Sequence, residues 1–185
     1  MGLDMYLYRR TYVQRWDHHS DDEKWSVTVT RGGQPTHVDP EKICYVLEEV
    51  GYWRKANAIH AWFVDHVQDS KDDCGGYRVT REDLEELLET INTVLASIET
   101  TPCPVETATV YGGDQIEHVF EDGEAIVNTE VCEKLLPSRG GFFFGSTEYN
   151  NFYVDDLKYT KELLKNLLSV DYGDASVSFS YTASW

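Results

Sequence analysis

The sequence predicts a single α+β domain spanning residues 1–185, with an antiparallel sheet packed against four or five helices on one face. Three observations predict this class. Both ends of the chain alternate apolar and polar residues, as half-buried strands do. The middle of the chain carries apolar residues at helical spacing. A length of 185 residues, 41% of them hydrophobic, suffices for one core, and no repeat or linker divides the chain.

The first segment, residues 2–14, reads GLDMYLYRRTYVQ. Leu3, Met5 and Leu7 fall on one face of it, which predicts a strand. Residues 24–33 repeat the alternation and end at two glycines. We expect these two strands to form an N-terminal hairpin across the polar loop between them.

Two helices are predicted next. The first begins at Pro40, with Asp39 as its N-cap, and stops at Gly51. The second covers residues 52–67, where apolar side chains recur every three or four positions.

The third helix, residues 80–98, is the clearest of all. Thr80 and Asp83 form a variant of the capping box, and leucines and isoleucines follow at helical spacing. A short helix is expected at residues 129–136, closed by a proline, and a long one at residues 151–168.

Residues 101–127 lose this periodicity because prolines and glycines interrupt short β-prone pieces. We expect loops and a short hairpin there.

The last strand shows the most regular alternation in the chain. Its apolar positions are Ala175, Val177, Phe179, Tyr181, Ala183 and Trp185. So regular an ending is expected to pair beside the N-terminal strand, which places residues 3–8 near residues 177–185.

The charge balance is strongly acidic, with 33 Asp and Glu against 16 Lys and Arg and a formal net charge of −17. Such a field repels phosphate backbones, so we expect no direct nucleic-acid binding. Two interpretations stay open: a solvated surface, or a face that binds a basic protein partner. No apolar stretch approaches the roughly 20 residues that span a bilayer, and no export signal opens the chain. A cytoplasmic protein without membrane contact is expected.

The cysteines are spread evenly and form no C-x-x-C pair; they are Cys44, Cys74, Cys103 and Cys132. We expect four reduced thiols, at least some of them in the core, and no zinc site. No metal or cofactor is predicted.

The first candidate site lies on the helix predicted at residues 52–67. At helical spacing Trp53, Asn57 and His60 share a face at the edge of the core. An imidazole beside an amide and an indole suits a planar ligand or a general base. The alternative is a buried His and Asn that satisfy each other or the backbone.

The second candidate is the run SRGGFFFGSTEYNN, residues 138–151. Its glycines permit unusual backbone angles, and the Arg139 guanidinium can donate two parallel hydrogen bonds to an anion. Polar groups from Ser146, Thr147, Glu148 and Tyr149 precede a helix start. A structural turn and cap, the lip of a small-molecule pocket and a protein-contact surface all stay open. The run matches neither a Walker loop nor a dinucleotide fingerprint.

We predict that these two segments converge on one pocket. Glu148 or Tyr149 would then hydrogen-bond His60, and Arg139 would be the only nearby permanent cation for an anionic ligand. Recognised catalytic signatures are absent, so no catalytic residue is assigned and a non-enzymatic role is favoured.

Four stretches carry a resemblance to known proteins: MGLDMYLYRRTYV, YWRKANAIHAWFV, GFFFGSTEYNNFYVDDLKYT and SFSYTASW. Together they resemble a group of small proteins encoded by bacteriophages, prophages and bacteria, for which no activity is established. The resemblance implies a phage-associated protein in a bacterial cytoplasm. With the acidity, it favours an interaction protein that engages a host or defence protein. The alternative is a small-molecule or nucleotide-binding protein, or an enzyme, with a pocket between residues 53–60 and 139–149.

Overall fold

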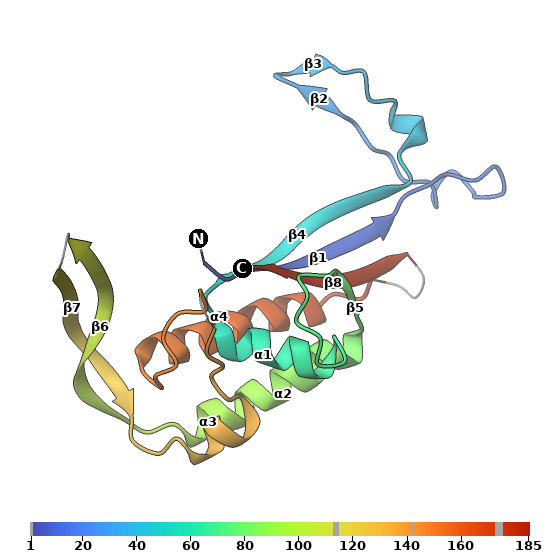
Figure 1. Ribbon diagram of the computed structural model, residues 1–185. Coiled ribbons are helices and arrows are strands. Elements are labelled where there is room, and N and C mark those ends of the chain that lie inside the picture. Colours follow the sequence, from blue (N-terminus) through green and yellow to red (C-terminus); the bar gives the residue numbers. More distant parts are fainter. Residues whose placement is uncertain (1, 113–114, 142, 173–175) are drawn as a thin grey trace.

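The computed structural model of the chain describes residues 2–112, 115–141, 143–172 and 176–185. Met1, Gly113, Phe142 and Ala175, which entered the sequence interpretation, lie outside the described residues. The structure confirms the α+β class, because helices cover one face of a four-stranded antiparallel sheet (Figure 1).

The sheet has the strand order β4-β1-β8-β5, with every pair antiparallel. The strands are β1 (Asp4–Tyr12), β4 (Tyr45–Arg54), β5 (Tyr77–Val79) and β8 (Val177–Ser184). Asp4 lies opposite Ser184 and Leu7 lies opposite Tyr181, which confirms the predicted meeting of the two chain ends. Trp185, expected on the apolar face, follows β8 and is 49% exposed.

The helix predicted from Pro40 to Gly51 was wrong. Asp39 does cap a turn, accepting a hydrogen bond from the Glu41 amide at 3.1 Å, but only a short 3-10 helix, η1 (Pro40–Lys42), forms. The rest becomes β4, which pairs with β1 along its whole length. A register shift of the pairing lets Gly51 and Trp53 face the core, and this long-range pairing outweighs the local helix start.

The expected partner of β1 was also wrong. Within residues 24–33 only Thr30–Arg31 (β2) is a strand, and it pairs with Gln34–Pro35 (β3). Gly32 and Gly33 have φ of 59° and 75°, the left-handed angles that a two-residue hairpin turn requires. The turn closes a small local hairpin that projects from the end of the sheet (Figure 1).

Residues 100–126 form a far longer hairpin than predicted, from β6 (Thr100–Gly112) and β7 (Gln115–Ile126). Its prolines are tolerated because both strands of a two-stranded ribbon are edges. It projects away from the other elements (Figure 1), and its base is tied down where the Ile126 amide donates to the Tyr149 carbonyl at 2.9 Å. We call it the β6–β7 arm.

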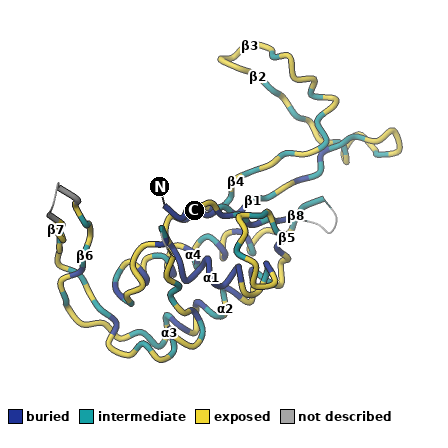
Figure 2. Tube along the Cα trace, in the orientation of Figure 1, coloured by how far each residue is buried: buried dark blue, intermediate teal, exposed yellow. Residues whose placement is uncertain are grey.

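The helices are α1 (Asn57–His66), α2 (Arg81–Ser97), α3 (Glu130–Leu135) and α4 (Asn151–Leu168). The last three confirm the predicted helices, and the Thr80–Asp83 capping box is present. Between these helices and the sheet lies the core, with fully buried side chains that include Leu7, Ile59, Phe63, Leu84, Leu157 and Tyr181. Figure 2 shows buried residues concentrated there, whereas the two projecting hairpins are largely exposed. The four cysteines are unpaired, and Cys132 is buried.

Candidate functional site

The two predicted segments do converge, and Asn57 joins them. Its amide nitrogen donates to the carbonyls of Phe144, at 3.1 Å, and Ser146, at 2.7 Å. Its amide oxygen accepts from the backbone amide of Arg139 at 3.1 Å. One turn later the His60 ring meets the Phe144 ring edge-on, with 5.2 Å between centroids. Asn57 therefore pins the glycine-rich run onto the start of α1.

The partners of His60 differ from the prediction. Its Nδ1 lies 2.7 Å from the Tyr181 hydroxyl and its Nε2 lies 3.1 Å from the Asp72 carboxylate. Glu148 and Tyr149 do not bond it, and the Tyr149 hydroxyl instead accepts from the Ser138 amide. Because a carboxylate only accepts hydrogen bonds, Nε2 carries the ring proton and donates to Asp72. Nδ1 then accepts a hydrogen bond from the Tyr181 hydroxyl.

His60 is fully buried, and burial lowers its pKa although the hydrogen bond to Asp72 opposes this. The imidazole is therefore neutral and hydrogen-bonded on both sides, by the side chains of Tyr181 and Asp72 and not by Asn57 or the backbone. Nothing in the spacing pointed to Asp72 or Tyr181, because one lies in a loop and the other on a distant strand.

Trp53 does not share a helical face with Asn57 and His60, because it belongs to β4. Its indole nitrogen donates to the Thr160 hydroxyl at 2.8 Å, and that hydroxyl donates to the Asp156 carbonyl at 2.7 Å. Trp53 thus fixes α4 against the sheet.

A pocket of about 340 Å³ opens beside this junction, between the start of α1, the first turns of α4 and the β6 strand. Of the eight predicted residues, Asn57, Ser146 and Glu148 line it. The polar side chains that prediction missed are Arg54, Lys55, Glu106, Ser138, Asn150, Asp155 and Asp156, with Thr107.

Trp53, His60, Arg139, Thr147 and Tyr149 do not line the pocket. Arg139 is not a free cation either, since its guanidinium forms a 2.5 Å ion pair with Asp65. The cations at the pocket are the exposed side chains of Arg54 and Lys55.

The α1 end of the pocket presents backbone donors. No side chain caps α1, and its first helical hydrogen bond runs from the His60 amide to the Ala56 carbonyl. The amides of Ala58 and Ile59 therefore lack helical acceptors, and both residues line the pocket. Helix N-termini of this kind attract negative charge.

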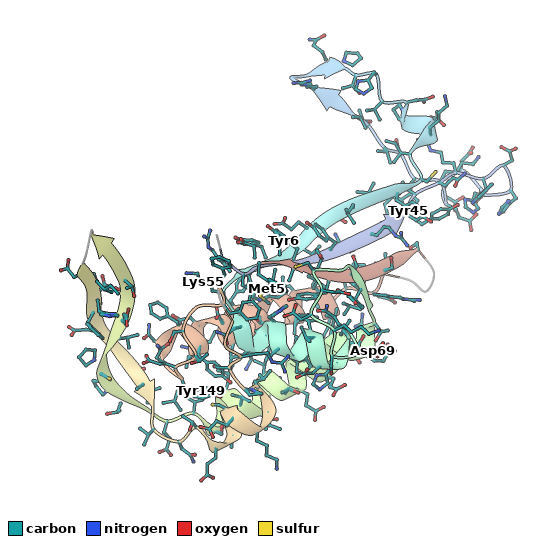
Figure 3. The ribbon with its side chains drawn as sticks, viewed as in Figure 1. Met5, Tyr6, Tyr45, Lys55, Asp69 and Tyr149 are labelled. Atoms are coloured by element: carbon teal, nitrogen blue, oxygen red, sulfur yellow. The ribbon has the colours of Figure 1, made fainter. Side chains whose placement is uncertain are left out.

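The chain reaches this helix through a tight approach of two segments. Lys55 adopts a left-handed backbone, with φ of 63°, and Gly145 has φ of 85°. A Cβ added to Gly145 would lie 3.2 Å from the Lys55 Cβ, closer than an ordinary van der Waals contact. Glycine avoids this close contact and also adopts the positive φ readily. Figure 3 shows Lys55 close to Met5, at the end of the sheet from which β4 leads into α1.

The α4 side of the pocket presents a titratable carboxyl. Asp156 is half-buried, and its burial, followed by the charge of Asp155, raises its pKa from 3.8 to about 7. A pKa near neutral pH means that a charge on a bound ligand can change the protonation of this carboxyl.

Comparison with protein-family models, with curated proteins and with solved structures found no match in any of the three. The resemblance to phage-encoded proteins therefore stays a prediction. In the part of the chain that the structure describes, no group of three or more His, Cys, Asp or Glu is placed to hold a metal ion. Among the same residues no helix is both long and apolar enough to cross a membrane.

Proposed function

We propose that this protein binds a small zwitterionic ligand, with an amino group and a carboxylate, in the pocket at the start of α1. The observation that supports this proposal is that the same pocket holds groups that bind an anion and a group that binds a cation. The amides of Ala58 and Ile59, which lack helical acceptors, suit a carboxylate together with Lys55 at the rim. Asp156 suits an ammonium group, whose positive charge favours the ionised carboxyl.

The charges of the pocket favour a zwitterion over a nucleotide. The lining holds two cations, Arg54 and Lys55, against the four carboxyl groups of Glu106, Glu148, Asp155 and Asp156. A phosphate with two negative charges would meet this acidic surround at close range and be repelled. A ligand with no net charge avoids that repulsion and still uses both kinds of partner.

The test is a thermal-shift screen with a matched trio: 4-aminobutyrate, butylamine and butyrate, with adenosine monophosphate as the anionic comparison. A ligand that binds only the folded chain raises the melting temperature, by several degrees at a hundredfold excess over Kd. We expect the zwitterion and other amino acids to raise it and the single-charge analogues to leave it unchanged. Shifts by the nucleotide alone would contradict the proposal.

Two variants locate the site. Asp156→Asn and Lys55→Gln should each weaken binding about tenfold or more, because each removes one charge partner. Glu89→Gln, an exposed carboxyl on α2, is the matched control and should bind as the natural chain does. Affinity should also fall by up to about tenfold per pH unit below 7, since an ammonium must then displace the Asp156 proton.

A second candidate function is that of a phage-associated interaction protein that engages a host or defence protein. The observation that favours it is the β6–β7 arm, which has no Lys or Arg between residues 100 and 126 and exposes Ile116 and Phe120. An acidic, apolar surface suits a basic partner. Capture from bacterial lysate should depend on salt and be lost in Ile116→Ser/Phe120→Ser; capture indifferent to both would contradict it.

A further inference from the structure

The face of the sheet that turns away from the helices is rich in tyrosine. Its aromatic side chains are Tyr6, Tyr8 and Tyr12 of β1 and Tyr45 and Tyr52 of β4, and we call this the tyrosine face. Tyr6 packs on Tyr52 with 5.3 Å between ring centroids, and Tyr12 packs on Tyr45 with 5.1 Å. Figure 3 shows Tyr6 and Tyr45 along this side of the sheet. No helix covers it (Figure 1), as far as the described residues extend.

The tyrosine face carries Asp4 and Glu49, but its end around Arg10 departs from the acidity of the chain. A hollow of about 950 Å³ on it is lined by Arg10, Arg78, Leu47 and serines of β8, and none of its lining residues is acidic. Arg10 stacks over the Tyr45 ring at 4.6 Å, and Leu47 is 61% exposed. Tyr and Arg are two of the residue types that are enriched in protein interfaces.

The β6–β7 arm has the complementary character. Ile116 and Phe120 are 60% and 58% exposed, and strand alternation puts both on one side of β7, together with Asp122. The two described strands of the arm carry five carboxylates: Glu106, Glu117, Glu121, Asp122 and Glu124. A two-stranded hairpin is marginal by itself in water, so an arm of this length gains from a surface that covers it.

We propose that the β6–β7 arm of one copy of the chain lies on the tyrosine face of a second copy, reciprocally, in a twofold dimer. This dimer rests on the second candidate function, in which the arm is an interaction surface, and it makes a second copy of the chain the partner of the arm. Apolar side chains of the arm would cover Leu47 and the tyrosine rings, and its carboxylates would meet Arg10 and Arg78.

The dimensions allow this exchange. At about 3.4 Å per residue, the 12-residue β7 reaches about 40 Å, longer than the roughly 30 Å of the nine-residue β1. In Figure 1 the arm rises beside the helices on the left and the β2–β3 hairpin extends from the right end of the sheet, so neither covers the tyrosine face. An approaching arm therefore has access to it.

Net charge opposes the dimer and sets the conditions of the test. Two chains of −17 repel each other over the Debye length, which shortens to about 8 Å at 0.15 M salt. The contacts between the arm and the tyrosine face act over distances shorter than the Debye length. Salt therefore weakens them less than it weakens the repulsion between the two net charges. Association is therefore measured at 0.15 M salt.

The experiment is analytical ultracentrifugation of the full chain and two double variants. The natural chain should sediment at about twice its mass of 21.3 kDa. Ile116→Ser/Phe120→Ser on the arm and Arg10→Glu/Arg78→Glu on the face should each be monomeric. All four residues are solvent-exposed, so the monomer should stay folded by circular dichroism. Lys134→Glu/Lys158→Glu, with the same change of charge at exposed helix positions, should stay dimeric.

Mixing the two monomeric variants gives the decisive result. One intact arm then meets one intact face, so reciprocal exchange predicts a heterodimer. A monomeric natural chain, a dimer that survives both double variants, or a mixture that stays monomeric would each overturn the exchange. A monomer that still captures another protein through its arm would overturn the exchange while leaving the interaction role intact.

Discussion

At the scale of single residues, Asp156 couples the pocket to pH. Its folded pKa, about 7, lies above the ordinary 3.8. The fold therefore prefers the protonated form, and the stability this gives is present below pH 3.8 and lost as pH rises through 7.

Asp156→Asn should accordingly raise the melting temperature at pH 8 by a few degrees, equivalent to about 1 kcal/mol after allowance for solvent screening. The gain should shrink toward pH 4, where the natural side chain is already neutral. Scanning calorimetry at both pH values measures it, with Glu89→Gln as the control. A lower melting temperature at pH 8 would show that the ionised carboxylate is stabilised by the fold.

His60 and Tyr181 form the second residue-scale prediction. Tyr181→Phe removes the donor to His60 Nδ1 and leaves a buried acceptor without its partner, which should cost about 1–3 kcal/mol. Tyr159→Phe, at an exposed position on α4, should cost little. Denaturant unfolding compares the two, and equal costs would mean that the His60 contact contributes nothing.

A comparison of Gly145 with Gly33 separates two costs of replacing a glycine that has positive φ: backbone strain and a clash of the added Cβ. Both have positive φ, but only at Gly145 would an added Cβ meet a neighbour, the Lys55 Cβ at 3.2 Å. Gly33→Ala should cost about 1 kcal/mol from backbone strain, and Gly145→Ala about 1–2 kcal/mol more. The difference, measured by thermal unfolding, reports how tightly the glycine-rich run is held to the pocket. Equal losses would show that this approach is loose.

At the scale of elements, α4 packs closely on β4 because Gly51 of β4 has no side chain. A Cβ on Gly51 would lie 2.7 Å from Leu163 Cδ2 and 3.0 Å from the Trp53 ring. Gly51→Ala should therefore destabilise the protein by about 1–3 kcal/mol through overpacking. Leu163→Ala in the same chain should recover part of that loss, and a double-mutant cycle measures the coupling. Additive losses would contradict direct contact between the helix and the strand.

At the scale of the whole molecule, the excess of negative charge acts on stability. A net charge of −17 repels itself more strongly in the compact state than in the expanded chain. Raising salt from about 0.01 to 0.15 M should therefore raise the melting temperature by a few degrees, because the Debye length shortens from about 30 to 8 Å. A melting temperature that fell with salt would show that attractive ion pairs outweigh this repulsion.

Much of the fold could be predicted from the sequence, because the signals involved are local. Alternation in β1 and β8 placed both strands, and the capping box with its apolar stripe placed α2, since periodicity and caps act within a few residues. The meeting of Asn57 with the 139–146 segment was also foreseen, from the polar groups that each segment carries.

Tertiary structure alone decided the rest. Residues 45–54 became a strand through pairing with β1, although Asp39 and Pro40 begin a helical turn. The partners of His60 came from a loop and a distant strand, and the pocket gained Lys55 and Asp156 because α1 and α4 converge there. Side-chain chemistry is written in the sequence, but which side chains face the same space depends on long-range pairing and packing energies that no short window of residues contains.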